Sequence, residues 1–205
     1  VKRVPGYMFY FDQDQTNLPK LTRVIFDENS SMEQFGPFAM YIYREDVQVE
    51  EFRLPDSIFA THDSSSFFLK TKHCYIPNLA NWCQSSFGSY TESNLICKAE
   101  NLYIEGELLT ATSEIVIPSS VEKISSKAFD RISRLRKVVL SEGVKEIGEQ
   151  AFYGTSITQI TIPTTLTRVG GYAFSSLSYS NVKVSISDVN AWSKIIFENV
   201  YLKRQ

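Results

Sequence analysis

Residues 158–174 read TQITIPTTLTRVGGYAF, and residues 136–152 read RKVVLSEGVKEIGEQAF. A third copy, SEIVIPSSVEKISSKAF, occupies residues 113–129. The last residues of the three copies, Phe129, Phe152 and Phe174, are 23 and 22 residues apart, and the apolar positions recur in the same order. A fixed stride of about 20–50 residues predicts a solenoid, in which every repeat forms one coil.

The alternation of side chains in the repeated phrase explains why it must repeat. In a strand at 159–162, Ile160 and Ile162 point to one face, and Gln159 and Thr161 point to the other. One coil cannot bury its own apolar face, whereas stacked coils can. We therefore expect the isoleucines to point inward and the three phenylalanines to form an interior column. Pro163 should end the strand, and Gly170-Gly171 should permit a sharp turn.

Weaker copies of the phrase lie nearer the N-terminus. The strings VPGYMF (4–9) and FGPFAM (35–40) match VGGYAF, and VIF (24–26) and FRLP (52–55) match the strand. The spacing between these copies is wider, which predicts insertions in the loops that join the coils.

A second, longer repeat pairs HCYIPNLANWCQSSF (73–87) with KVSISDVNAWSKIIF (183–197) at a constant offset of 110 residues. Each copy should be a strand followed by a short helix, with Asn78 or Asp188 as the N-cap and the tryptophan, Trp82 or Trp192, as a packing anchor. The string NLYIEGELL (101–109) predicts a hairpin that turns at Glu105-Gly106.

The 22–23 residue stride falls within the range of leucine-rich repeats, about 20–29 residues. We predict an α/β leucine-rich-repeat solenoid, predominantly β, with one short parallel strand per coil and short helices or turns in the connections. The whole chain, 1–205, is expected to form one continuous solenoid. Its parts are degenerate repeats (1–72), a strand, tryptophan helix and hairpin insert (73–112), regular repeats (113–182) and a second tryptophan-helix segment (183–205). Since the chain starts inside a repeat phrase, we expect an excerpt of a longer protein or degenerate ends that act as caps.

The three consecutive phrases of 113–174 resemble the BspA-like leucine-rich repeats of bacterial cell-surface proteins. The departures are Ser125-Ser126 in place of the usual glycine, and Met8-Phe9 and Ala39-Met40 in place of Ala-Phe. The resemblance implies a secreted or cell-surface location and binding to proteins of host or neighbouring cells, in a family that is not known as an enzyme class.

Composition narrows the classes of partner. Lys and Arg number 21 against 23 Asp and Glu, a net charge of -2, which does not favour nucleic-acid binding. No run approaches the roughly 18 apolar residues of a membrane-spanning helix, and residues 1–20 lack the layout of a signal peptide. Three cysteines, Cys74, Cys83 and Cys97, do not settle the redox compartment.

The reactive side chains do not form a catalytic or metal-binding pattern. His73, Cys74 and Cys83 correspond to Lys183, Val184 and Ser193 in the second long copy, and ligands would not be replaced in this way. We expect Cys74 to be a core residue. The adjacent His62, Asp63 and Ser64 are no sign of a triad, because triads converge in space rather than in sequence. Asn29-Ser30-Ser31 is a glycosylation sequon that matters only in a eukaryotic secretory setting. We expect no catalytic residues, cofactor or metal ion.

The outward strand face remains as the candidate binding surface for a protein or glycan of host or neighbouring cells. Its central row is expected to include Lys183 in line with Thr161, and the face comprises Ile25, Arg53, Tyr75, Val116, Lys137, Val139, Gln159, Thr161 and Lys183. The leading hypothesis is a non-catalytic recognition module of a secreted or surface-anchored bacterial protein that acts in adhesion or host interaction. A structural spacer with no ligand of its own is the alternative, and a hydrolase is a third.

Overall fold

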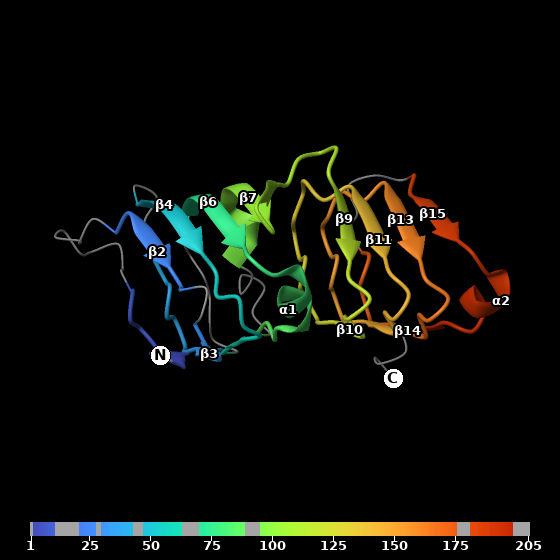
Figure 1. Cartoon of the computed structure of the whole chain (residues 1–205), viewed down its shortest axis with the longest axis horizontal. Coiled ribbons are helices and arrows are strands. Elements are labelled where there is room, and N and C mark those ends of the chain that lie inside the picture. Colours follow the sequence, from blue (N-terminus) through green and yellow to red (C-terminus); the bar gives the residue numbers. More distant parts are fainter. Residues whose placement is uncertain are drawn as a thin grey trace, which may run out of the picture. The chain divides into compact units, whose positions relative to one another are not determined.

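A computed structural model describes residues 2–10, 21–27, 30–42, 47–62, 70–88, 95–175 and 181–198. The chain divides into two compact units, unit 1 (Val1–Leu109) and unit 2 (Thr110–Gln205). The elements of both are labelled in Figure 1. The expectation of one continuous solenoid over 1–205 concerns how the units join, and it stays a prediction.

Unit 1 arranges its strands in two sheets. The larger has the order β2-β4-β6-β7-β8, with β2 at Arg23–Ile25, β4 at Gln48–Arg53, β6 at Lys70–Ile76, β7 at Ala99–Ile104 and β8 at Glu107–Leu108. Its first four strands are parallel, and β8 returns antiparallel to β7. The smaller sheet is parallel, with β1 at Arg3–Val4, β3 at Gln34–Phe35 and β5 at Ala60–Thr61. Helix α1 (Leu79–Gln84) follows β6, and the short 3-10 helix η1 (Leu95–Lys98) precedes β7.

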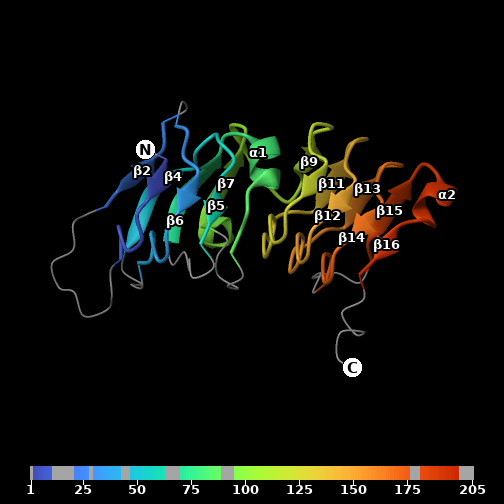
Figure 2. The same cartoon turned by 90° about the horizontal axis from the view of Figure 1, so that it is seen from below.

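Unit 2 repeats this plan with two parallel four-stranded sheets. One contains β9 (Glu114–Ile117), β11 (Lys137–Leu140), β13 (Gln159–Ile162) and β15 (Lys183–Ile186). The other contains β10 (Lys123–Ile124), β12 (Glu146–Ile147), β14 (Arg168–Val169) and β16 (Ile196–Phe197). Helix α2 (Val189–Trp192) joins β15 to β16. Figure 2 shows the two layers, with β11, β13 and β15 in one and β12, β14 and β16 in the other. The chain passes from one layer to the other and adds one strand to each per coil, so the predicted leucine-rich-repeat solenoid is confirmed.

Side-chain alternation in the strands follows the prediction. In β13, Ile160 and Ile162 are buried, Gln159 is exposed and Thr161 is partly exposed. Each buried isoleucine contributes about 1.5–3 kcal/mol to the stability of its coil. The outward side chains of these strands are not part of the core, so packing does not restrict which residue types occupy these positions.

The predicted phenylalanine column is present. The ring centroids of Phe129 and Phe152 are 5.1 Å apart, those of Phe152 and Phe174 are 5.3 Å apart, and both pairs are parallel to within 1°. Phe129 and Phe152 are completely buried. The backbones of the weaker N-terminal phrases bond in the matching pattern: the Tyr7 and Phe9 amides donate to the Pro37 and Ala39 carbonyls at 2.9 and 3.0 Å, as the Phe129 amide donates to the Ala151 carbonyl in unit 2.

The glycines of the phrase serve close packing rather than the turn itself. The left-handed residue of the turn is the one before Ala-Phe, with φ of 63° at Lys127, 56° at Gln150 and 57° at Tyr172. Gly170 is needed because a Cβ there would lie 2.6 Å from the backbone nitrogen of Glu149 in the preceding coil. The expectation that Gly170-Gly171 supplies the sharp turn is thus corrected, since the turn residue is Tyr172.

The two tryptophan-helix segments form where predicted. Trp82 is buried, as expected of a packing anchor, whereas α2, which contains Trp192, has no buried residue. The Asn78 side chain accepts a hydrogen bond from the Asn81 amide, and the Asp188 side chain accepts from the Asn190 and Ala191 amides. The 101–109 segment is the expected hairpin, with φ of 50° at Glu105 and 88° at Gly106. Its first strand, β7, also pairs in parallel with β6, so it is a full member of the sheet.

Candidate functional site

The outward face of the large sheet of unit 1 carries two neighbouring rows, each formed by side chains at paired positions of adjacent strands. Because the strands are parallel and in register, Ile25 pairs with Arg53, Arg53 with Tyr75, and Tyr75 with Tyr103. The antiparallel β8 adds Leu108 opposite Tyr103. These five residues, Ile25, Arg53, Tyr75, Tyr103 and Leu108, are called the tyrosine–arginine stripe below.

The planar groups at the centre of the stripe are stacked on one another. The rings of Tyr75 and Tyr103 lie 4.6 Å apart at an interplanar angle of 15°, and Cζ of Arg53 lies 4.8 Å from the centroid of Tyr75. A pair of stacked rings contributes about 0.5–1.5 kcal/mol and an exposed cation–π contact about 0.5–1 kcal/mol. These contacts hold the three side chains in place before any partner arrives.

The second row, Arg23, Glu51, His73 and Asn101, supports the stripe from one side. The Glu51 carboxylate accepts from Nε of Arg23 at 2.8 Å and lies 3.5 Å from a guanidinium nitrogen of Arg53. Nδ1 of His73 lies 3.3 Å from the Tyr103 hydroxyl. One carboxylate thus serves two guanidinium groups, which leaves the pair of rows with a net positive charge.

Electrostatics keep Tyr75 protonated. Burial raises the pKa of the Tyr75 phenol above its ordinary value, and the neighbouring Tyr103 and Glu51 raise it further, against smaller opposing effects of Arg53 and Arg23. The hydroxyl is therefore a hydrogen-bond donor at neutral pH, next to the donors of the Arg53 guanidinium.

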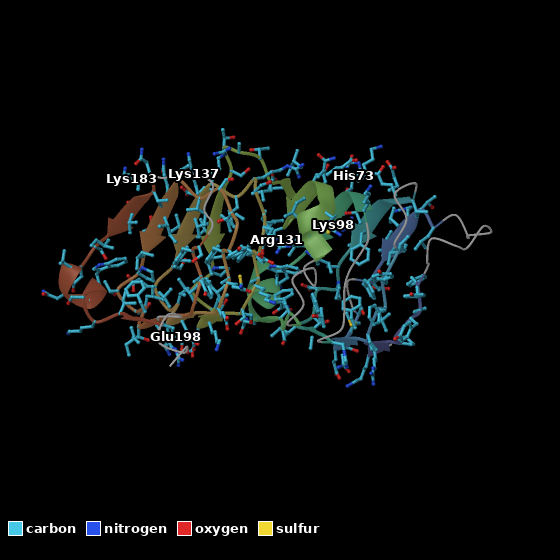
Figure 3. All side chains as sticks on the ribbon, turned by 180° about the vertical axis from the view of Figure 1, so that it is seen from behind. His73, Lys98, Arg131, Lys137, Lys183 and Glu198 are labelled. Atoms are coloured by element: carbon cyan, nitrogen blue, oxygen red, sulfur yellow. The ribbon has the colours of Figure 1, made fainter. Side chains whose placement is uncertain are left out.

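The outward face of unit 2 has a different chemistry. One row runs through Val116, Val139, Thr161 and Ser185, and the neighbouring row runs through Glu114, Lys137, Gln159 and Lys183. Both rows are free of aromatic side chains. Lys137 and Lys183 extend from one side of unit 2, and Glu198 lies on the other side (Figure 3).

One residue of the expected face occupies another row than predicted. Lys183 pairs with Gln159 rather than with Thr161, whose neighbour is Ser185. The reason is the length of the connection, because Gln159 and Lys183 are 24 residues apart and the expected alignment assumed a stride of 22. Lys183 still points outward, since a shift of two residues preserves the face of a strand.

A match to a protein family identifies the type of repeat in unit 2. Residues 109–204 match the family model described as "BspA type Leucine rich repeat region (6 copies)". This part of the chain is a BspA-type leucine-rich repeat region. The resemblance expected from the phrases of 113–174 is therefore confirmed, and the BspA-type region contains the two outward rows of unit 2. The tyrosine–arginine stripe lies in unit 1, before the matched residues.

No curated protein sequence matches the chain. Among solved structures, the crystal structure of the pneumococcal vaccine antigen PcpA is similar, with a TM-score of 0.43 and 20% identity over 91% of this chain. A leucine rich cell surface protein from Faecalibacterium prausnitzii A2-165 gives a TM-score of 0.31 and 17% identity over 97% of this chain and 80% of its own length. The match covers 56% of the length of the pneumococcal protein.

The structure places the predicted face residues in two separate groups. Ile25, Arg53 and Tyr75 are neighbours in unit 1, and the other six lie in the BspA-type region. Sequence reasoning missed Tyr103. The alternation in NLYI would have revealed it, because Leu102 and Ile104 are buried and the residue between them must point outward.

The side chains of Cys74 and Cys83 belong to the core rather than to a reactive site. Cys74 is buried, as predicted, and burial raises the pKa of its thiol to about 12. Burial also raises the pKa of the Cys83 thiol, so both thiols are protonated and unreactive at neutral pH. His62 is exposed, and Asp63, Ser64 and Asn29 lie outside the described residues.

Three further observations concern features other than the outward faces. In the described part of the chain, no three His, Cys, Asp or Glu side chains gather closely enough to hold a metal ion. A cavity of about 570 Å³ in unit 1 is lined mainly by apolar groups such as Val4, Val24 and Phe26, and no histidine lines it. None of the helices over the described ranges has the length and apolar character needed to span a membrane.

Proposed function

We propose that the chain is a non-catalytic recognition module of a secreted or surface-anchored bacterial protein, which binds a protein or glycan of host or neighbouring cells in adhesion or host interaction. The tyrosine–arginine stripe of unit 1 is the main contact surface. The outward rows of the BspA-type region, with Val116, Lys137, Val139, Gln159, Thr161 and Lys183, form a second contact face.

The single observation that carries the proposal is the stacked order of Arg53, Tyr75 and Tyr103 on an open sheet. Tyrosine and arginine are among the residues that dominate binding energy at protein interfaces. Because their positions are already held by mutual contacts, binding costs little side-chain entropy. Ile25 and Leu108, both exposed, place apolar surface at the two ends of the stripe.

The shape of the surface favours a macromolecule over a small molecule. The stripe crosses five strands and lies on the surface of a sheet, whereas sites for small molecules are concave and enclose most of the ligand. Stacked coils offer extended faces that suit such partners. The BspA-type repeats support a secreted or cell-surface location, because the resemblance associates them with bacterial cell-surface proteins.

The test is a printed array of purified extracellular-matrix proteins and defined glycans. The array is probed with the full chain and with variants that fold as the wild type does. The double variant Tyr75→Ala/Tyr103→Ala should lose about 30-fold or more in affinity, the factor that a loss of about 2 kcal/mol at an interface hot spot produces. Lys123→Ala is the control. Lys123 is exposed on β10, in the sheet of unit 2 that carries neither proposed contact face, so its replacement should leave affinity unchanged. Equal binding by the double variant, or no bound spot on the array, would contradict the proposal and favour the spacer.

A further inference from the structure

The two arginines on the outward face of unit 1 differ in how closely they approach a carboxylate. Arg23 contacts one oxygen of Glu51 through two nitrogens, at 2.8 Å from Nε and 2.7 Å from Nη2. Arg53 lies 3.5 Å from the other oxygen of Glu51, and in the described part of the chain its guanidinium makes no hydrogen bond. The Glu51 carboxylate is therefore bound mainly by Arg23, and the N–H donors of Arg53 can accept a further partner.

Stacking fixes the position of the Arg53 guanidinium. Its Cζ lies 4.8 Å from the centroid of Tyr75, and the Tyr103 ring lies 4.6 Å from the same ring. Because β6 lies between β4 and β7, Arg53 and Tyr103 cover opposite faces of Tyr75. The edge of Tyr75 stays open, and its hydroxyl makes no hydrogen bond to any described residue. A guanidinium and a phenol thus lie side by side with unused donors.

A carboxylate is the group that these donors match. The planar guanidinium presents parallel N–H groups that bind the two oxygens of a carboxylate, and such charge-assisted pairs are stronger than neutral hydrogen bonds. A second carboxylate of β4, that of Glu50, is paired with Lys72 at 2.7 Å, so it is engaged elsewhere. The stripe therefore lacks a close anionic partner for Arg53 that a ligand can supply.

The surroundings of Arg53 favour a polypeptide over a sugar as the source of the carboxylate. A sugar ring commonly binds by stacking its C–H groups on an open aromatic face, and both faces of Tyr75 are covered. The ends of the stripe are apolar, since Ile25 is 48% and Leu108 41% exposed. Aliphatic side chains, which an acidic sugar does not have, would cover these two ends.

The spacing of the stripe sets the pattern of side chains that would fit it. Adjacent strands are about 4.8 Å apart, so the four intervals from Ile25 to Leu108 span about 19 Å. An extended chain rises about 3.3 Å per residue, so side chains on one of its sides recur every 6.6 Å or so, about twice that rise. If the first lies over Ile25, the second falls between Arg53 and Tyr75, the third beside Tyr103 and the fourth beside Leu108.

On the basis of the recognition function proposed above, we propose that the partner of the stripe is an extended protein segment with an aspartate or glutamate whose carboxylate binds Arg53 and the Tyr75 hydroxyl. The segment crosses the strands of the sheet. Seven of its residues cover the stripe, with the acidic residue at the third position and apolar residues at the first, fifth and seventh. Arg53 selects the acidic residue, and the apolar ends of the stripe set the register.

The probe is a fluorescently labelled synthetic peptide, LTETLTL, with both termini blocked so that its glutamate is the charged group. Its anisotropy is titrated with the full chain. Saturable binding is expected, and the matched neutral peptide LTQTLTL should bind at least fivefold more weakly. Binding of the acidic peptide should weaken as salt is added, because exposed ion pairs are screened. Equal affinities of the two peptides, or no binding at millimolar protein, would overturn the proposal.

Variants of the full chain locate the charge that matters. Arg53→Gln should bind both peptides with the same affinity, and Arg53→Lys should restore only part of the difference, because an ammonium lacks the planar fork. Lys123→Gln removes the same charge from an exposed position in unit 2 and should leave the difference intact. A preference for the acidic peptide that persists in Arg53→Gln would contradict the proposal. The peptide pair on the wild type decides the matter even if an Arg53 variant fails to fold.

Two further arms separate the alternatives. Sialyllactose and a heparin-derived oligosaccharide are titrated in the same way, and a sugar that binds through Arg53 where the acidic peptide does not would assign the site to an acidic glycan and overturn the proposal. An array partner that Tyr75→Ala/Tyr103→Ala loses and Arg53→Gln retains at full affinity would leave the recognition function standing and refute the acidic partner. An array partner that both variants bind as the wild type does would contradict the recognition function of the stripe itself.

Discussion

Replacement of Phe152 by alanine is the perturbation that most directly probes the packing of the coils. The side chain is completely buried and stacked between Phe129 and Phe174, at 5.1 and 5.3 Å. Truncation of a buried phenylalanine costs about 3–5 kcal/mol, from lost burial and the cavity left behind. The two lost ring contacts, at about 0.5–1.5 kcal/mol each, place Phe152→Ala in the upper half of that range.

The assay is urea denaturation of the full chain, followed by tryptophan fluorescence. The two tryptophans, Trp82 and Trp192, lie one in each unit, so a Trp82→Phe background reports on unit 2 alone. Phe174→Ala is the matched control. Phe174 is only partly buried and has one ring of the column beside it in the described structure, so its loss should cost less than the loss of Phe152. A cost below about 1 kcal/mol for Phe152→Ala would refute the packing described here.

Two further substitutions test the backbone approach and the facing of the strands. Gly170→Ala should lower the free energy of unfolding by about 2 kcal/mol or more, because its Cβ would lie 2.6 Å from the Glu149 nitrogen and the backbone must shift; a melting temperature equal to that of the wild type would show that the coils are not so close. Thr161→Lys should change stability by less than about 0.5 kcal/mol, because Thr161 points outward between Val139 and Ser185. A large loss, measured by thermal denaturation, would mean that the inner and outer faces of β13 are reversed.

Much of the fold can be predicted from the sequence because one stride repeats. Alternation sets the inward positions of Ile160 and Ile162, and the regular stride aligns the phenylalanine column. The N-caps Asn78 and Asp188 follow from local chemistry, since each side chain bonds to an amide two or three residues ahead.

The parts that escaped prediction depend on loop length and on contacts between coils. The row of Lys183 depends on how the connection before β15 accommodates two additional residues, which a fixed stride does not reveal. The sequence predicts a turn role for Gly170, because its close packing against Glu149 is visible only when coils are stacked. Tyr103 was missed because its segment was treated as an isolated hairpin, although β7 also belongs to the parallel sheet.

The coil packing that leaves one face of each strand outward can be tested in solution by nuclear Overhauser spectroscopy of the full chain with labelled phenylalanine. The structure predicts cross-peaks between the ring protons of Phe152 and those of both Phe129 and Phe174, and none between Phe129 and Phe174, which the ring of Phe152 separates. A spectrum in which Phe152 contacts neither ring would contradict the stacked coils and the surface they present.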